Sequence, residues 1–245
     1  MNNNVYLKLE NVKKSLANFE LDNVSFSLPK GYIMGLIGSN GAGKTTTLRM
    51  LSGLLPPSGG AARIMGHDVG EESLAAKQLL NVSPQETAVA PKLSVRENLE
   101  LMARLYGKNR RQGANRVETL LQEFRLTERA KDRAKSLSGG MQRRLSIAMA
   151  LVSEPQVLFL DEPTLGLDVR ARRDLWAQIE RLKGRITVIL TTHYLEEAEA
   201  LADRIGIMSR GRMQVVGTAE EIKRETGAAT LEDAFLTLTD EEVPA

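Results

Sequence analysis

A nine-residue run of small, hydroxyl and basic residues, GSNGAGKTT, begins at Gly38. It matches the pattern G-x-x-x-x-G-K-[ST], in which glycines let backbone N–H groups wrap around phosphates. In that pattern Lys44 reaches the β- and γ-phosphates, and the Thr45 hydroxyl binds Mg²⁺. A Gly-rich turn that binds nothing is the alternative. A strand pattern before the run and a helix pattern after it favour a nucleotide site formed by Gly38, Ser39, Asn40, Gly41, Ala42, Gly43, Lys44, Thr45 and Thr46.

Two adjacent acids, Asp161 and Glu162, follow the apolar run VLFL. Open α/β sheets bind their ligands at the carboxyl ends of the strands, which is the edge where the phosphate loop also lies. Asp161 therefore suits a ligand of Mg²⁺, and Glu162 suits a base that polarises an attacking water. Two exposed acids that only end a strand are the alternative, and the neighbouring phosphate loop makes it the weaker one.

The run LSGGMQRRLS places an N-cap, Ser138, before two glycines at the first helical positions. Each glycine costs a helix about 1 kcal/mol relative to alanine, so an ordinary helix start has no use for two. A bare backbone at a helix N-terminus suits close approach to a phosphate. We therefore predict a second anion site at Ser138, Gly139 and Gly140, with an N-cap in a flexible loop as the alternative.

The elements that must position these residues alternate between apolar strand patterns and helical patterns, which predicts an α/β fold with a mostly parallel sheet. The buried-strand patterns are YIMGLIG (32–38), VLFLD (157–161) and ITVILTTH (186–193). Between the last two lies a helix whose apolar face carries Leu175, Ile179 and Leu182, with Gly184 at its stop. The chain before the phosphate loop is expected to form an antiparallel β region that begins with a hairpin.

The segment 90–155 differs, because it shows helical patterns and no convincing strand. Its first helix begins with a capping box, Ser94 and Glu97, and Gly107 lies just past its end. We predict one domain, 1–245, in which this helical subdomain is inserted into a nucleotide-binding core of 1–89 and 156–245. After Arg204, a hairpin turning at SRGR and two short helices within 218–245, capped by Thr218 and Thr230, are expected.

Composition excludes several classes of protein. The chain has 245 residues, 26% of them charged, and a formal net charge of only +2, with basic and acidic residues interleaved, so no nucleic-acid partner is expected. It has no cysteine, which excludes disulfides and Cys-ligated metals. The start, MNNNVYLKLE, lacks the regions of a signal peptide, and no apolar run approaches the ~20 residues that cross a bilayer.

In their order along the chain, GSNGAGKTT, LSGGMQRR and VLFLDEP resemble the ATP-binding subunit of ABC transporters. The resemblance implies an ATPase that binds ATP and Mg²⁺, in which Ser138, Gly139 and Gly140 contact the γ-phosphate held by an opposing subunit. It also implies three further roles. Gln85 in SPQE would sense Mg²⁺ and the attacking water, Asp168 in LGLD would lie at the dimer interface, and His193 in LTTH would hold the γ-phosphate. A histidine that only ends a strand is the alternative for His193.

The sequence departs from the family at two places. The family usually has an aromatic residue that stacks on adenine, whereas the equivalent place here holds Leu16, with Phe19 nearby as a substitute. Phe19 could instead be a core residue of the first hairpin. Val169 follows Asp168 where proline is frequent, which we expect to matter little. His67 has no supporting pattern and is taken as a surface residue.

The tail VVGTAEEIKRETGAATLEDAFLTLT resembles those of bacterial drug, antibiotic and sodium exporter ATPases, whose membrane subunits are separate chains. The expected partners are therefore a second copy or a homologous ATPase subunit, and integral membrane permease subunits. The chain would lie at the cytoplasmic face of the cell membrane, held there by those subunits. The ATPase of an importer and a non-transport ABC ATPase that acts as a switch are the alternatives.

Overall fold

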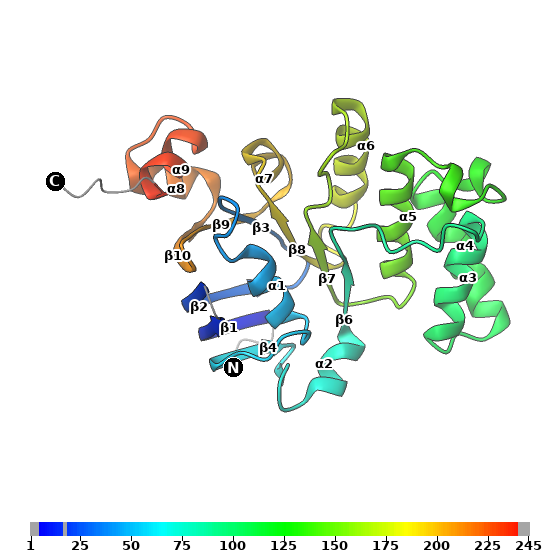
Figure 1. Cartoon of the computed structure of the whole chain (residues 1–245), viewed down its shortest axis with the longest axis horizontal. Coiled ribbons are helices and arrows are strands. Elements are labelled where there is room, and N and C mark those ends of the chain that lie inside the picture. Colours follow the sequence, from blue (N-terminus) through cyan, green and yellow to red (C-terminus); the bar gives the residue numbers. More distant parts are fainter. Residues whose placement is uncertain (1–4, 17–18, 240–245) are drawn as a thin grey trace.

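The computed structural model describes residues 5–16 and 19–239 (Figure 1). It contains two β-sheets and a group of helices that lies at one end of the molecule (Figure 1). The predicted α/β class, with a mostly parallel sheet and an antiparallel β region near the N-terminus, is confirmed.

The larger sheet has six strands in the order β10-β9-β3-β8-β7-β6. All neighbours in it are parallel except β10 and β9, which form the expected C-terminal hairpin. Its central strands are fully buried, which explains their continuous apolar runs. The strands are β3 (Ile33–Ile37), β6 (Leu80–Ser83), β7 (Val157–Asp161), β8 (Thr187–Thr192), β9 (Arg204–Ser209) and β10 (Arg212–Gly217).

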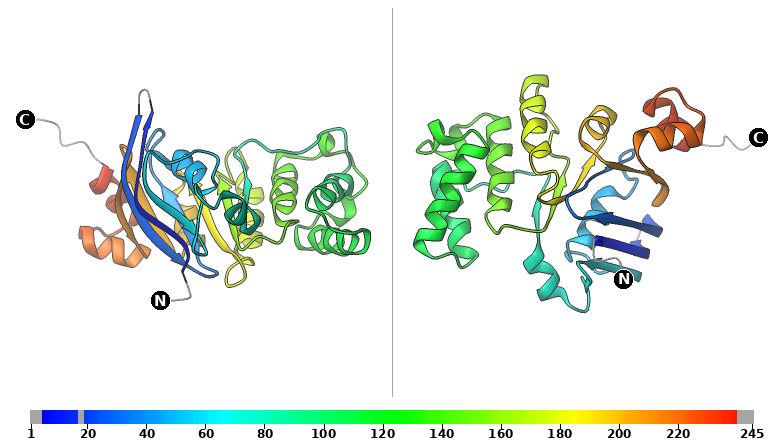
Figure 2. Two further views of the ribbon diagram at one scale, coloured as in Figure 1. Left: turned by 90° about the horizontal axis from the view of Figure 1, so that it is seen from below. Right: turned by 180° about the vertical axis from the view of Figure 1, so that it is seen from behind.

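The smaller sheet is antiparallel and has the order β2-β1-β4-β5 (Figure 2). Its strands alternate buried and exposed residues, because one face packs on the core and the other meets solvent. Helix α1 (Lys44–Leu51) contributes Leu48, Met50 and Leu51 to a core shared by both sheets. The strands are β1 (Val5–Leu16), β2 (Phe19–Pro29), β4 (Gly59–Ile64) and β5 (His67–Asp68).

Residues 90–155 are helical, and the described structure places no strand of the two sheets there (Figure 1). The capping box of Ser94 and Glu97 is present, and Gly107 follows the helix with a φ of 70°. These helices share a core with the face of the six-stranded sheet that carries Leu158 and Leu160. That they form a separate subdomain stays a prediction. The elements are α3 (Val95–Leu105), α4 (Arg110–Glu123), α5 (Gly139–Leu151) and the 3₁₀ turns Thr127–Arg129 and Ala134–Ser136.

The remaining helices cover the larger sheet or extend the tail. Helix α6 buries Leu175 and Ile179 as expected, but it ends at Glu180, and a turn carries the chain on to Gly184. Thr218 forms a full capping box, and the Thr230 hydroxyl accepts a bond from the Asp233 amide. In the described residues no helix is both long and apolar enough to cross a membrane. The helices are α2 (Ser73–Leu79), α6 (Val169–Glu180), α7 (Leu195–Leu201), α8 (Ala219–Thr226) and α9 (Leu231–Thr239).

Candidate nucleotide-binding site

The phosphate loop connects the buried strand β3 to helix α1, as its sequence predicts. Gly43 has a φ of 107°, a conformation that glycine adopts without steric cost. A Cβ built on Gly43 would meet the Phe19 ring at 2.9 Å, so this position also lets the ring approach the loop backbone. The loop therefore presents bare backbone N–H groups at the positive end of a helix.

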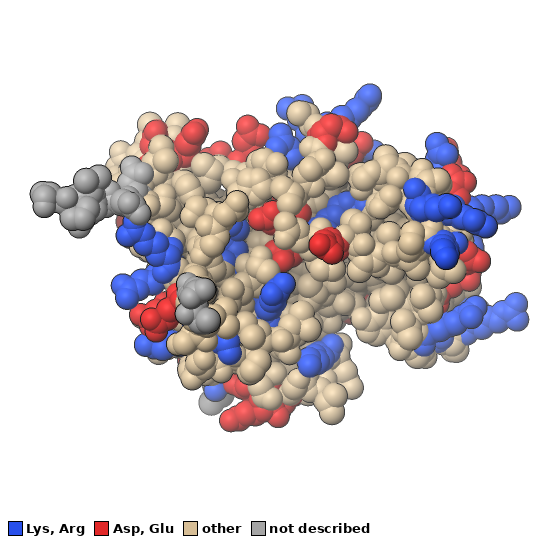
Figure 3. Space-filling model, in the orientation of Figure 1, with Lys and Arg blue, Asp and Glu red and all other residues tan. Residues whose placement is uncertain are grey.

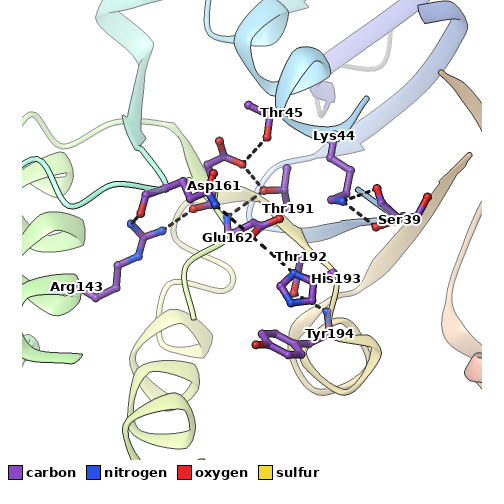
Figure 4. A network of polar contacts seen from close by, with 12 residues as sticks. Ser39, Lys44, Thr45, Arg143, Asp161, Glu162, Thr191, Thr192, His193 and Tyr194 are labelled. Atoms are coloured by element: carbon purple, nitrogen blue, oxygen red, sulfur yellow. Dashed lines mark hydrogen bonds and ion pairs between the residues drawn. The ribbon is translucent and has the colours of Figure 1, made fainter. Parts of the chain in front are cut away.

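The side chain of Lys44 lies inside this loop, with only 6% of the residue exposed. Its ammonium donates to the carbonyl oxygens of Gly38 at 2.7 Å and Ser39 at 3.0 Å (Figure 4). Burial lowers the pKa of Lys44, and the carboxylates of Glu162 and Asp161 oppose that shift. A phosphate group bound in the loop would supply an anionic partner for this buried cation.

Asp161 ends strand β7 and faces the first turn of α1. Its Oδ1 accepts hydrogen bonds from the hydroxyls of Thr45 at 3.1 Å and Thr191 at 2.6 Å (Figure 4). A carboxylate and a hydroxyl are the hard oxygen ligands that Mg²⁺ prefers, and Mg²⁺ usually takes its other ligands from water and phosphate. The described residues contain no cluster of three or more His, Cys, Asp or Glu side chains that could hold a metal ion.

Glu162 lies next to Asp161 and gathers two further polar side chains. Gln85 Nε2 donates to Glu162 Oε2 at 3.5 Å, and His193 Nδ1 lies 3.6 Å from the same oxygen. Glu162 has a φ of 44°, an uncommon conformation for a residue other than glycine. Three residues from separate parts of the sequence, each expected to act on the γ-phosphate or the water, therefore meet at one point.

These groups open into a cleft of about 880 Å³, which is the size of a small-molecule site. The phosphate loop lines it together with Leu16 and Phe19. Leu16 is 44% exposed, whereas Phe19 is half-buried and also packs against the core shared by the two sheets. The lining consists of residues 40–46 together with Leu16, Phe19, Gln85, Glu162, Leu165 and His193.

The second predicted anion site lies elsewhere. Ser138 caps helix α5 through the Met141 amide, and it lines a separate hollow of about 170 Å³ with Gly140 and Asp168. A Cβ on Gly140 would meet Ala171 Cβ at 3.0 Å, so close packing against α6 explains that glycine. Apart from its chain neighbours and the backbone of α5, a Cβ on Gly139 would meet no atom of residues 5–16 and 19–239 within 4 Å. Packing within this chain therefore does not account for Gly139.

Residues 21–165, more than half of the chain, match the family described as ABC transporter. This segment contains the phosphate loop, the LSGG run and the Asp161–Glu162 pair. The chain belongs to the ABC transporter family. It is an ABC ATP-binding domain, and these domains hydrolyse ATP to power transport.

Individual relatives agree with this assignment. The linearmycin resistance ATP-binding protein of Bacillus subtilis is 41% identical over 227 residues, a match that covers 92% of this chain and 73% of that protein. The daunorubicin resistance ATP-binding protein of Streptomyces coeruleorubidus is 45% identical over 84% of this chain and 66% of its own length. The chain thus spans about two thirds to three quarters of these relatives. A solved ATP-binding subunit of an ABC transporter superposes with a TM-score of 0.84, at 31% identity, and the match covers 95% of this chain and 99% of that one.

The structure also places three other residues named in the sequence: Asp168, Val169 and His67. Asp168 Oδ1 accepts the amides of Arg170 and Ala171 at 2.9 Å each, so this residue caps α6 whatever it does at an interface. Val169, which replaces the frequent proline, is the first residue of α6 and is 60% exposed. His67 is half-buried and pairs with Glu72 at 3.1 Å, outside the cleft.

Two residues that the sequence reading missed belong to this site. Thr191 holds Asp161 from the neighbouring strand, and Arg143 reaches the segments around both Gln85 and Glu162. A polar residue in a buried strand was the available signal for Thr191. For Arg143 the signal was a basic residue one turn after the glycine pair, on the face of α5 that packs inward.

The position of Phe19 leads to a prediction on base recognition. Phe19→Ala should weaken ATP binding by about 1–3 kcal/mol, the contribution of an aromatic face to a base, and Leu16→Ala should weaken it less. Titration calorimetry on both folded variants measures the affinities, and thermal unfolding measures stability. A Phe19→Ala protein with a lower melting temperature and unchanged affinity would show that Phe19 is a core residue only. Tighter binding by Leu16→Tyr would show that the site lacks its usual aromatic.

Proposed function

We propose that two copies of this ABC domain close head to tail around two ATP molecules, and that hydrolysis reopens them. One observation carries the proposal. The cleft holds the phosphate loop, Glu162, Gln85 and His193, whereas Ser138 and Gly140 line a separate hollow of the same chain. A second chain can bring its LSGG run to the nucleotide that this chain cannot cover itself.

In this mechanism the side chains of one copy hold and activate the nucleotide. Lys44 and the loop amides bind the phosphates, and the oxygens of Thr45 and Asp161 would hold Mg²⁺, which supplies positive charge to the phosphates when bound. Glu162 accepts a proton from the attacking water, while Gln85 and His193 orient the water and the γ-phosphate. The opposing Ser138 and Gly139 complete the phosphate site.

The dependence of ATP hydrolysis on protein concentration tests this proposal. If only the dimer hydrolyses ATP, activity per chain should rise with protein concentration and level off once the dimer is saturated. Steady-state ATPase assays over a wide dilution series measure this. Activity per chain that stays constant across the series would indicate hydrolysis by single copies and would contradict the proposal.

We also propose that the dimer drives a membrane permease, and that the permease is an exporter. The two relatives named for resistance to linearmycin and daunorubicin support this choice. The docking surface would lie where the Gln85 segment meets the helical region. It would extend along α3 to the end of that helix, where Leu105 is 70% exposed and the hydroxyl of the exposed Tyr106 accepts a bond from Asn81 of strand β6 at 2.8 Å. Basic side chains gather at the same end of the molecule (Figure 3).

The variant Leu105→Glu should lose its permease, because a carboxylate would be buried in an apolar contact. Detergent co-purification with the polytopic membrane protein of an adjacent gene measures this, and Leu74→Glu on α2, which is 82% exposed, is the matched control. Equal recovery of the permease with both variants would remove this surface from the contact. If the unchanged protein recovers soluble partners alone, the non-transport switch would be favoured. If it recovers the permease of an importer, the proposed direction of transport would be reversed.

A further inference from the structure

Arg143 has an unusual environment for a charged side chain. It lies on helix α5 with only 4% of the residue exposed. Its guanidinium donates to four backbone carbonyls, and Figure 4 shows it directed toward Asp161. Nε reaches Pro163 O at 2.9 Å, Nη2 reaches Asp161 O at 2.6 Å, and Nη1 reaches Gln85 O at 3.1 Å and also binds Pro84 O. The acceptors come from two segments that are more than 70 residues apart in sequence.

The charge of this side chain is retained although it is buried. Burial lowers the pKa of Arg143 to about 10, while the nearby charges of Asp161, Glu197 and Glu162 oppose that shift. The guanidinium is therefore protonated at neutral pH and can use all of its donors. A buried cation held by neutral carbonyls costs more than an apolar side chain of similar volume, so core stability alone does not explain it.

One pair of acceptors flanks Glu162. The carbonyls of Asp161 and Pro163 belong to the residues directly before and after it, and Arg143 binds both. The Glu162 amide donates to Thr191 on the other side, with Oγ1 at 3.0 Å and O at 3.1 Å. Glu162 has the uncommon φ of 44°, which persists only where the surroundings hold it. Arg143 therefore fixes the backbone that aims the Glu162 carboxylate.

The other pair of acceptors belongs to the Gln85 segment. This segment leaves β6 at Ser83 and reaches α3 at Val95 without a helix or strand in between. A guanidinium has a rigid planar fork that holds several acceptors in fixed directions, which an ammonium cannot do. The bonds to the carbonyls of Pro84 and Gln85 thus tie this irregular segment to α5, the helix that begins with the LSGG run.

We infer that Arg143 is a positioning residue that fixes both Glu162 and Gln85 with respect to helix α5. One buried side chain thereby connects the carboxylate proposed to activate the water, the glutamine proposed to sense Mg²⁺ and that water, and the helix that begins with the LSGG run. Any rotation of α5 relative to the sheet has to carry the Gln85 segment along or break these bonds. The inference rests on the proposed ATP hydrolysis for its catalytic consequence, but the positional claim can be measured without nucleotide.

The test compares Arg143→Lys with Arg116→Gln. Arg116 is a half-buried arginine of α4 that donates to a backbone carbonyl, Leu151 O at 2.6 Å, away from the cleft. Lysine keeps the charge but loses the planar fork, so kcat should fall by roughly 100-fold, the effect of a misplacement near 1 Å, with little change in KM for ATP. In a second variant, Arg143→Gln, kcat should fall by at least the same factor. Arg116→Gln should keep the kcat of the unchanged protein.

The distance between two spin labels reports the position of the Gln85 segment, and a general loss of stability in the folded protein would not change it. The chain has no cysteine, so Glu86→Cys beside Gln85 and Leu74→Cys on α2 provide the only two labelling sites. Double electron–electron resonance without nucleotide measures the distance between the two labels. The distribution of this distance should be narrow in the double-cysteine parent and when Arg116→Gln is added, and broad when Arg143→Lys is added. A narrow distribution in Arg143→Lys, or an equal broadening in Arg116→Gln, would overturn the inference. Absence of ATPase activity in the parent would instead refute the proposed function and leave the distance comparison valid.

Discussion

Replacing the Glu162 carboxylate by an amide is expected to leave ATP bound and to slow its hydrolysis by roughly 10²–10⁴-fold, the usual contribution of one general base. Glutamine keeps the size of the side chain but cannot accept the proton of the attacking water. The phosphates keep Lys44 and the loop amides as partners, and Asp161 and Thr45 are unchanged. Binding and chemistry therefore separate in this variant.

Single-turnover hydrolysis and equilibrium ATP binding, measured on the same Glu162→Gln protein, test this separation. The matched control is Glu196→Gln, which removes a carboxylate that is 77% exposed and lies three residues after His193. It should hydrolyse ATP at the parent rate. Hydrolysis by Glu162→Gln within a few-fold of the parent would remove Glu162 from the role of base.

The variant Gly139→Leu is expected to abolish the ATP-dependent dimer while the monomer folds and binds ATP normally. Apart from its chain neighbours and the backbone of α5, a Cβ at this position meets no atom of the described residues within 4 Å, and leucine favours a helix over glycine by several tenths of a kcal/mol or more. The side chain would instead occupy the space that the nucleotide of the opposing copy needs. A substitution that maintains or raises stability and removes assembly is hard to explain by damage to the fold.

Three measurements on Gly139→Leu decide the matter. Thermal unfolding should show a melting temperature equal to or above that of the parent, ATP affinity of the monomer should be unchanged, and ATP hydrolysis should be lost. The variant Ser94→Ala, which removes only an N-cap on α3, should lower stability and keep assembly. A Gly139→Leu protein that still forms the dimer would refute the role of this helix start.

Much of the site could be predicted because it depends on local pattern. The phosphate loop, the acids at the end of β7 and the cap of α5 each need a short run of particular residue types next to a strand or a helix, and the structure has those elements in place. The parallel sheet follows for the same reason, since its strands are short apolar runs separated by helices. These features are fixed by neighbours in sequence.

The rest depends on contacts between distant segments. Arg143 lies next to Arg144 in the sequence, and only packing of α5 against the sheet brings it to the carbonyls of Gln85 and Asp161. Phe19 matches both a hairpin core and an adenine-stacking residue, and the structure places it at the core and the cleft together. The separation of Ser138 from the nucleotide cleft is likewise a property of tertiary structure.

The mass of the Glu162→Gln protein in solution, measured by light scattering with and without ATP and Mg²⁺, shows whether ATP brings two copies together. Slow hydrolysis should keep the closed state populated, so the mass with nucleotide should be twice the 27.0 kDa of the chain. Without nucleotide, or with ATP in the Gly139→Leu background, the mass should be that of one chain. A mass that does not change when ATP and Mg²⁺ are added would contradict the account.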